Sequence, residues 1–582
     1  YPLIEQVGSN SIIDRGFYSS KMVNDTSEDF DFILLVSSLI VFIALLISYG
    51  RLELAILAFL PMIICWVIIL ALMSLLDIKF NIVNVILATF IFGIGDDFSI
   101  FIMDGLMHEH RTGRKMLGAH KTAIFFSAFT TIVGMGAMIF AKHPALKSVA
   151  VISVLGIAVV ILVSYTVQPF LFKLFISSKK GHNVFPFTLG GILSTLYTYI
   201  YFICGAFSVI VLRLLLYIVP IRQRKKKEII RWFLHIISKV YLKTMAIVDM
   251  KWDIPQGEDF KKPALIIANH QSWCDLLIML AINPKLIIIT KDNVWTAPVI
   301  GWIVRFADYY HIGQGYEFVM EKLREKVEEG NSILIFPEGT RSPDCRIGRF
   351  HKGAFCLAEK LKIDILPAVL YGAGHVCSKT QPTQINVGHI VCRFLDRVAY
   401  DDTRFGVTYQ EKTKAFRKYI IAEFIKLNDQ YGRFTDPYFR HAPIKKFLYK
   451  GKDMEKDIRI RHREKGYFDT WDSLVPRNAG FSDICGSEEH LCLMLSLMSP
   501  YRTLGGNDIY IADDSIDVRT IIDRLKTLNH GGKMLIKADE GILQKFSEVR
   551  KEIDIKTEAI QWNDTASMKI YKLTLIHTDN EN

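Results

Sequence analysis

The sequence predicts a multidomain protein: an α-helical transmembrane bundle, then an α/β domain, then a small α/β Rossmann-like domain. Apolar residues concentrate before residue 220, in five runs that are each long enough to cross a bilayer. Residues 264–268 and 332–336 are short apolar runs typical of buried strands, and a polar cluster follows each of them. After residue 445, strand-like and helix-like segments alternate again. A chain of 582 residues has room for about three or four such domains.

The apolar runs predict five membrane spans. They cover residues 32–49, 54–76, 82–105, 121–141 and 147–176. Basic residues flank the runs at Arg51, at 111–121 and at 173–180, whereas the opposite connections are short and less basic. Because basic loops stay in the cytosol, we expect the bundle to cover residues 31–178 and residues 1–30 to end an extracytoplasmic segment.

The third run carries two adjacent carboxyl groups, Asp96 and Asp97, near its middle. Charged side chains at membrane depth are costly, and they usually face the bundle interior and serve ion or proton pathways. We therefore predict a proton relay at these two residues. The alternative is that the span starts later and that the pair meets water at the membrane surface.

Residues 187–228 form another apolar segment with a basic end. Two crossings need about 40 residues, which is more than 187–219 provides. One crossing would leave the basic cluster Arg222–Lys227 outside, against the positive-inside rule. We therefore expect an interfacial or re-entrant helix pair that starts and ends in the cytosol, followed by a basic linker on anionic headgroups.

The first polar cluster, residues 269–275, reads Asn-His-Gln-Ser-Trp-Cys-Asp. His270 and Asp275 are five positions apart, so they would not share one face of a regular helix. They can meet if the histidine lies in a turn and the aspartate in the first turn of the following helix. The carboxylate would then fix the imidazole tautomer, and His270 could remove the proton of a hydroxyl that attacks a thioester. The alternative is a purely structural pair.

The second polar cluster, residues 336–342, reads Phe-Pro-Glu-Gly-Thr-Arg-Ser. Arg341 offers a planar fork of donors that suits a phosphate group, and Gly339 permits a close approach of the backbone. A solvated basic loop is the alternative, but it does not account for the position of the cluster directly after a buried strand.

The charge and the cysteines limit the class of partner. The net charge is +11, and much of the excess flanks membrane segments, so we expect anionic lipid and no nucleic acid as a partner. The nine cysteines form no Cys-x-x-Cys pair and no metal spacing. We therefore expect reduced, buried thiols and no metal site.

Residues 1–176 resemble the last six-helix repeat of the RND superfamily, in its MMPL-like exporter branch, without the first helix of the repeat. That branch carries Gly-x-Asp-Tyr, and this chain has Gly95-Asp96-Asp97-Phe98, so Asp97 matches the family aspartate and Phe98 replaces the tyrosine. The resemblance implies proton-driven export of a lipid-like substrate. Because the chain starts at Tyr1, we expect the missing N-terminal part of the exporter to be a partner.

The two polar clusters resemble the glycerophosphate and lysophosphatidate acyltransferases (PlsC-like), over about residues 229–440. The first family block, Asn-His-x-x-x-x-Asp, is present here, and so is the block Phe-Pro-Glu-Gly-Thr-Arg-Ser. The resemblance implies that His270 is the base, that Asp275 orients it, and that acyl-CoA or acyl-ACP is the donor. The residues implied to bind the substrate are Asn269, Glu338, Gly339, Thr340 and Arg341.

One family block departs from the usual pattern. The stretch Ala307–Gly313 reads Ala-Asp-Tyr-Tyr-His-Ile-Gly, and Gly313 stands where the family has a phosphate-binding arginine. An acceptor with a head group other than that of lysophosphatidate is therefore possible.

Residues 445–582 resemble a class I methyltransferase in the order of their segments. Such folds bind S-adenosylmethionine through a glycine-rich loop after the first strand. Here that loop has one glycine, Gly486, followed by Ser-Glu-Glu. We expect a degenerate domain that does not bind S-adenosylmethionine, with an active methyltransferase as the alternative.

These expectations combine into a membrane-bound O-acyltransferase fused to part of a lipid exporter. It would acylate a hydroxyl of a lysophospholipid-like acceptor without a tightly bound cofactor. We expect it to be a multi-pass protein of the bacterial inner membrane, with both α/β domains in the cytosol. The alternative is a lipid or aryl-polyene exporter component whose acyltransferase-like domain acylates a non-glycerolipid acceptor or only binds lipid.

Overall fold

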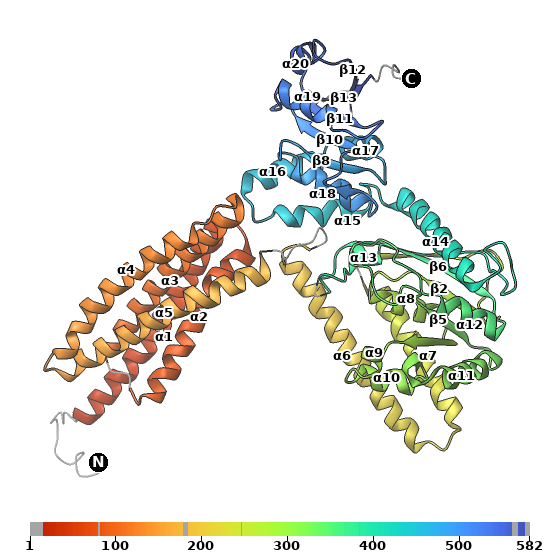
Figure 1. Ribbon diagram of the computed structural model, residues 1–582. Coiled ribbons are helices and arrows are strands. Elements are labelled where there is room, and N and C mark those ends of the chain that lie inside the picture. Colours follow the sequence, from red (N-terminus) through yellow and green to blue (C-terminus); the bar gives the residue numbers. More distant parts are fainter. Residues whose placement is uncertain are drawn as a thin grey trace. The chain divides into compact units, whose positions relative to one another are not determined.

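The computed structural model describes residues 15–78, 82–177, 184–245, 247–382, 384–561 and 568–576. It divides into two compact units (Figure 1). The first comprises residues 1–178 with 449–451, and the second comprises residues 179–448 with 452–582. Residues 1–14 of the predicted extracytoplasmic segment lie outside the described residues.

The first unit is a helical bundle. Its helices are α1 Arg15–Tyr49, α2 Leu52–Leu75, α3 Ile82–Thr112, α4 Leu117–Gly136 with the 3₁₀ turn η1 Ala137–Phe140, and α5 Pro144–Phe175. Helix α5 packs against α2, α3 and α4. Two buried polar contacts join these helices: Ser99 Oγ donates to the Ala58 carbonyl, and Gln168 Nε2 donates to the Ser99 carbonyl at 2.9 Å. Such pairing offsets the cost of placing polar groups in an apolar bundle.

Each of the five predicted spans lies within a helix of this bundle to within one residue, except that the span at 121–141 continues from α4 through η1. Among the described residues, four helices of the chain are long and apolar enough to cross a membrane. They are Leu52–Leu75, Leu117–Phe140, Pro144–Phe175 and Leu189–Ile218. The first three are predicted spans, and the apolar part of α1, Leu35–Tyr49, is shorter.

The segment at residues 187–228 differs from its prediction. Its apolar part is one unbroken helix, α6 Leu189–Ile218, and not a helix pair. The reason is that prolines stand only outside it, at Pro186 and Pro220, so nothing interrupts the helix. The basic cluster is not a linker but the first turns of α7 Gln223–Thr244. Since α7 packs on the α/β domain, the predicted domain start at residue 229 falls inside a helix.

The second unit contains a seven-stranded sheet. Its strands are β1 Val248–Asp253, β2 Leu265–Ala268, β3 Leu286–Thr290, β4 Tyr310–His311, β5 Ser332–Ile335, β6 Ile365–Tyr371 and β7 Gly388–Phe394. The order is β1-β7-β6-β2-β5-β3-β4, and only the β6–β7 pair is antiparallel. The predicted strands at 264–268 and 332–336 are confirmed as β2 and β5. The ends of both therefore meet at the carboxyl edge of the sheet, where α/β proteins bind ligands.

Helices cover both faces of this sheet (Figure 1). They are α8 Cys274–Ile282, α9 Asp292–Trp295, α10 Ile300–Phe306, α11 Tyr316–Glu328, α12 Gly353–Leu361, α13 Ala373–Val376 and α14 Tyr409–Tyr431, with the 3₁₀ turn η2 Ile312–Gln314. Alternate residues of β2 enter opposite cores. Ile266 and Ala268 face α7 and α8, whereas Leu265 and Ile267 face α11, α12 and α14. Burial on both faces accounts for the continuous apolar run of this strand.

A second α/β layer follows, as predicted for residues 445–582. Its strands are β8 Gly480–Asp483, β9 Thr503–Leu504, β10 Ile509–Asp513, β11 Lys533–Ala538, β12 Ile555–Ile560 and β13 Lys569–Leu575. The order is β12-β13-β11-β10-β8-β9; β13 is antiparallel to both of its neighbours, and the other pairs are parallel. Its helices are α15 Pro437–His441, η3 Pro443–Phe447, α16 Lys452–Arg461, α17 Tyr467–Leu474, α18 Glu489–Met498, α19 Val518–Lys526 and α20 Ile542–Val549. Membership of the Rossmann-like class stays a prediction.

Candidate active site

His270 lies in the turn between β2 and α8, and Asp275 lies in the first turn of α8, as the spacing predicts. The His270 Nδ1 and Asp275 Oδ2 atoms are 2.8 Å apart. The same oxygen accepts hydrogen bonds from the backbone amides of Gln271, at 2.6 Å, and Ser272, at 2.8 Å. The turn therefore holds the carboxylate in one position, and the carboxylate holds the imidazole.

The surroundings of His270 suit a proton acceptor. Asp275 is fully buried, so its charge acts on the ring without screening by water. The ring also stacks on Phe336, with 4.2 Å between the ring centroids. Since a carboxylate keeps the proton on Nδ1, Nε2 is the nitrogen that can accept a proton from a substrate.

Asn269 joins two strands of the sheet and is fully buried. Its side-chain nitrogen donates to the Leu370 carbonyl at 2.9 Å, and its side-chain oxygen accepts from the Leu370 amide at 2.7 Å. This predicted substrate-binding residue thus fixes the end of β2 to β6, and its amide is occupied by the main chain.

Glu338 connects the two polar clusters. Its Oε1 accepts the His270 backbone amide at 2.8 Å, and its Oε2 accepts the Gly348 backbone amide at 2.7 Å. Burial raises the pKa of this carboxyl, and the two backbone hydrogen bonds oppose that rise. Both oxygens are used by the protein, so the structure gives Glu338 the role of a brace behind His270.

The turn at Gly339 and Thr340 lies among cations. Gly339 has φ +64°, a conformation that favours glycine, and a Cβ there would stand 3.4 Å from the His351 ring and 3.7 Å from Lys291 Cε. Lys379 Nζ donates to Thr340 Oγ1 at 3.2 Å and to the Arg341 carbonyl at 2.6 Å. Arg341, Lys291 and Lys379 together form a cationic group that can hold a phosphate.

Sequence reasoning missed Lys291 and Lys379. Lys291 directly follows β3, so its place after a short apolar run is a signal that could have identified it. Lys379 lies in the loop after α13, far from either motif, and nothing local distinguishes it from other lysines.

The atoms around Gly313 leave no room for a side chain unless they move. A Cβ on Gly313 would come within 2.8 Å of Asp292 Oδ1 and of His311 Cε1. His311 Nδ1 lies 2.7 Å from Asp292 Oδ1, and the His311 ring packs on Trp295 at 4.7 Å. An aromatic and histidine cluster thus occupies the surroundings of the position at which the family pattern has an arginine.

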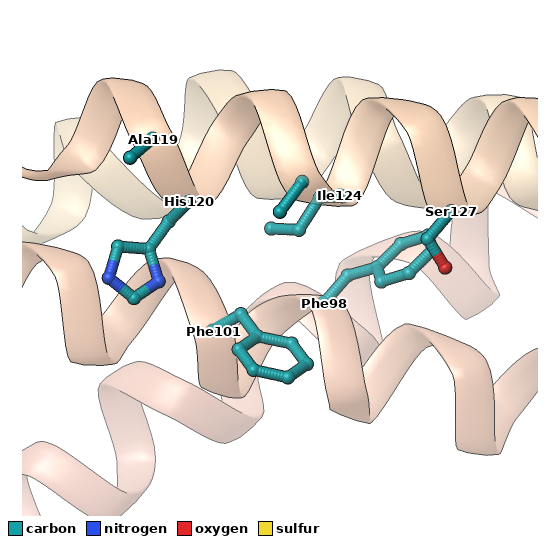
Figure 2. A pocket seen from close by; sticks show the side chains of 7 residues that line it. Phe98, Phe101, Ala119, His120, Ile124 and Ser127 are labelled. Carbon is teal, nitrogen blue, oxygen red and sulfur yellow. The ribbon is translucent and has the colours of Figure 1, made fainter.

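The proton relay at Asp96 and Asp97 stays a prediction. Asp97 is exposed on α3 and does not face the interior of the described bundle, whereas Phe98 is buried. The side chain of Asp96 lies outside the described part of the structure. Phe98 lines a pocket of about 450 Å³ between α3 and α4 (Figure 2). Its other lining residues are Phe101, Ala119, His120, Ala123, Ile124 and Ser127.

No group of three or more potential metal ligands occurs among the described residues. The second unit offers a base at His270 and a cationic turn at residues 339–341.

Two family models match separate parts of the chain. Residues 247–371 match the acyltransferase family, and residues 17–183 match the MMPL family. The chain carries an acyltransferase-family domain and an MMPL-family region. The MMPL match and the apolar helices together indicate a membrane protein.

Curated relatives match the acyltransferase region. A chloroplastic 1-acyl-sn-glycerol-3-phosphate acyltransferase of Brassica napus is 30% identical over 167 residues, which is 28% of this chain and 48% of the relative. One from Chlamydomonas reinhardtii is 31% identical, over 22% of this chain and 40% of the relative. A lyso-ornithine lipid O-acyltransferase of Pseudomonas aeruginosa is 30% identical, over 20% and 45%. The chain spans about half the length of these relatives.

The crystal structure of the 1-acyl-sn-glycerophosphate acyltransferase PlsC from Thermotoga maritima is also similar. It is 21% identical and has a TM-score of 0.34. The similarity covers 41% of this chain and 96% of that chain.

Proposed function

We propose that the second unit transfers a fatty acyl group from acyl-CoA or acyl-ACP to a hydroxyl of a lysophospholipid-like acceptor. The observation that carries this proposal is the His270–Asp275 pair, fixed at the carboxyl edge of the sheet beside a cationic turn. A base next to a phosphate site fits an acceptor with both a hydroxyl and an anionic head group. The curated relatives support the same chemistry.

In this mechanism His270 Nε2 removes the proton of the acceptor hydroxyl as its oxygen attacks the thioester carbonyl. A new C–O ester bond forms and the C–S bond breaks. The imidazolium then returns its proton to the departing thiolate, so the enzyme ends the cycle unchanged. Asp275 stabilises the transient positive charge on the ring and stays ionised. No tightly bound cofactor is needed.

The acceptor is proposed to bind through the cations around Gly339. Arg341, Lys379 and Lys291 suit a phosphate, but the position of the usual family arginine is Gly313. We therefore also propose acceptors whose head group contacts the His311 imidazole and the Trp295 indole in place of an arginine. The lyso-ornithine lipid enzyme among the relatives makes that lipid a sensible second substrate to assay.

The MMPL-family region favours a second function, the export of a lipid across the bacterial inner membrane. We propose that the acyl transfer product is the exported lipid. The rival proposal is that the acyltransferase domain only binds lipid for the exporter. Acyl-donor turnover distinguishes the two, because a lipid-binding domain would leave the thioester intact.

The test is a thioester assay on the whole 582-residue chain in detergent, with acyl-CoA or acyl-ACP and either lysophosphatidate or lyso-ornithine lipid. We expect His270→Ala to lower the rate by about 10²–10⁴-fold, because the general base is lost. His441→Ala removes an exposed histidine of the same unit and should keep the wild-type rate. Residual activity of His270→Ala within a few-fold of wild type would exclude the catalytic assignment.

Lipid mass spectrometry of cells extends this test to export. Wild-type cells should contain an acylated lipid that His270→Ala cells lack, and part of it should lie beyond the inner membrane. A product found only in the inner membrane would argue against export.

A further inference from the structure

The loop that follows the second polar cluster, residues 342–350, is held from three directions. On the site side, its Gly348 amide donates to Glu338 Oε2, as described above. From α14, Arg417 Nε donates to the Gly348 carbonyl at 2.6 Å, and Arg417 donates a second bond to the Ile347 carbonyl at 3.1 Å. The loop thus determines where Glu338, and through it the His270 amide, can lie.

The third direction is the C-terminal α/β layer. Arg346 donates through Nε to the Pro500 carbonyl and through its terminal nitrogen to the Arg502 carbonyl, at 3.1 Å. The side chain between these carbonyls, Tyr501, packs against the core of the first sheet, and its ring lies 6.5 Å from that of Phe424. Residues 500–502 therefore form a contact between the C-terminal layer and the loop behind the site.

This contact segment is fixed within its own layer. The Arg502 side chain has no exposed surface and pairs with Asp472 Oδ1 at 2.7 Å. It also donates to the carbonyls of Leu495, Asp472, Pro476 and Val475. A buried guanidinium with this many acceptors is a rigid element, so the segment has one position from which to hold Arg346.

We propose that the C-terminal layer positions the catalytic histidine, with Arg346 and Tyr501 as the positioning residues. The path runs from residues 500–502 through Arg346 to Gly348, then to Glu338 and the His270 amide. This inference rests on the proposed acyl transfer, and it gives the C-terminal layer a role that needs no ligand of its own. A preorganised base is faster because a small displacement of a reacting group is costly.

The experiment uses the whole 582-residue chain with Arg346→Ala. We expect kcat to fall about 10- to 100-fold with the KM for the thioester unchanged, because the base is displaced while the donor still binds. Arg349→Ala is the matched control, since Arg349 is an exposed arginine of the same loop, and it should keep the wild-type kcat. Equal losses in both variants would mean that loop charge, not the contact with residues 500–502, matters, and would overturn the proposal.

Tyr501 provides an independent arm. Tyr501→Ala should lower kcat as Arg346→Ala does, whereas Tyr501→Phe keeps the packed ring and should restore it. A wild-type kcat in both Arg346→Ala and Tyr501→Ala would refute the positioning role.

A physical readout separates this proposal from the proposed function. Amide hydrogen exchange of residues 346–348 and of His270 should accelerate about tenfold in Arg346→Ala and not in Arg349→Ala. If the wild type turns over no thioester, the acyl transfer proposal fails, and the exchange pattern still decides whether the C-terminal layer holds the loop. Unchanged exchange in Arg346→Ala would overturn the coupling.

Discussion

Glu338 and Asn269 belong to motifs whose family role is to bind substrate, yet each is fully engaged with the main chain. Asn269 pairs with both backbone groups of Leu370, and Glu338 pairs with the amides of His270 and Gly348. The cations at residues 291, 341 and 379 are left to meet the substrate. At the scale of single residues, Asn269 and Glu338 brace the turn that carries His270, and we propose that Arg341 and the two lysines outside the polar clusters bind the acceptor.

Glu338→Gln tests the brace. A glutamine can accept only one of the two amides, because its NH₂ group would face the other N–H. An unsatisfied buried donor costs about 1–3 kcal/mol, so we expect a lower melting temperature in detergent and a lower kcat. Glu325→Gln, at a half-exposed side chain, should change stability by less than about 0.5 kcal/mol. A Glu338→Gln protein as stable and as active as wild type would contradict the role of a brace.

At the scale of elements, what could be predicted depended on distance along the chain. The His270–Asp275 pair joins residues five apart, and strand, turn and helix were sufficient to predict it. The Asn269–Leu370 pair joins residues 101 apart, and no local pattern contains the partner. The hydrogen bond from Arg346 to the Arg502 carbonyl joins residues 156 apart and was likewise not predictable.

The length of the apolar run did not predict the structure of helix α6 correctly. Its 30 residues are too few for two crossings, and the sequence alone suggested a helix pair. The sequence could not show that one side of the helix is covered by protein: Val209 and Leu216 are buried in the core beneath the first sheet.

The prediction that the C-terminal layer does not bind S-adenosylmethionine depends on the loop after β8. The Asp483 carboxylate accepts the amides of Gly486 and Glu488, so the loop closes on itself. Glu488 is 2% exposed and pairs with Arg461 at 2.7 Å and with Lys537 at 3.2 Å. A ligand entering there would have to break two partly buried ion pairs, which is costly.

We therefore expect S-adenosylmethionine not to raise the melting temperature of the 582-residue chain. A ligand at 100 times its Kd would add about 2.7 kcal/mol to the stability of the domain that binds it, which a melting experiment detects. A dose-dependent increase at micromolar S-adenosylmethionine would show a functional methyltransferase-type site instead.

At the scale of the whole molecule, α6 decides on which side of the membrane the second unit lies. It is apolar enough to span, and only 11% of its apolar window is buried inside the protein, although three of its side chains contact the second unit. Tyr201 Oη donates to the Ile237 carbonyl of α7 at 2.9 Å, the Phe202 ring lies 4.8 Å from Trp273, and Arg213 lies over Phe306. These contacts lie on one side of α6, and most of its other apolar side chains are exposed. Because the basic cluster at residues 222–227 follows α6 directly, it stays our prediction that α6 lies in the membrane surface, with its exposed leucines and isoleucines in the lipid.

If α6 does not cross the membrane, the residues before and after it lie on the same side. The positions of the basic residues predict that this side is the cytosol. We therefore expect Met454→Cys, at a side chain that is 42% exposed, to resist a membrane-impermeant thiol reagent in intact cells and to react after lysis. Lys142→Cys, in the short exposed connection between α4 and α5, should react in intact cells. The wild-type chain corrects for its nine native cysteines. Labelling of Met454→Cys in intact cells would place the active site outside the cytosol, away from acyl-CoA and acyl-ACP, and the proposed acyl donors would then be wrong.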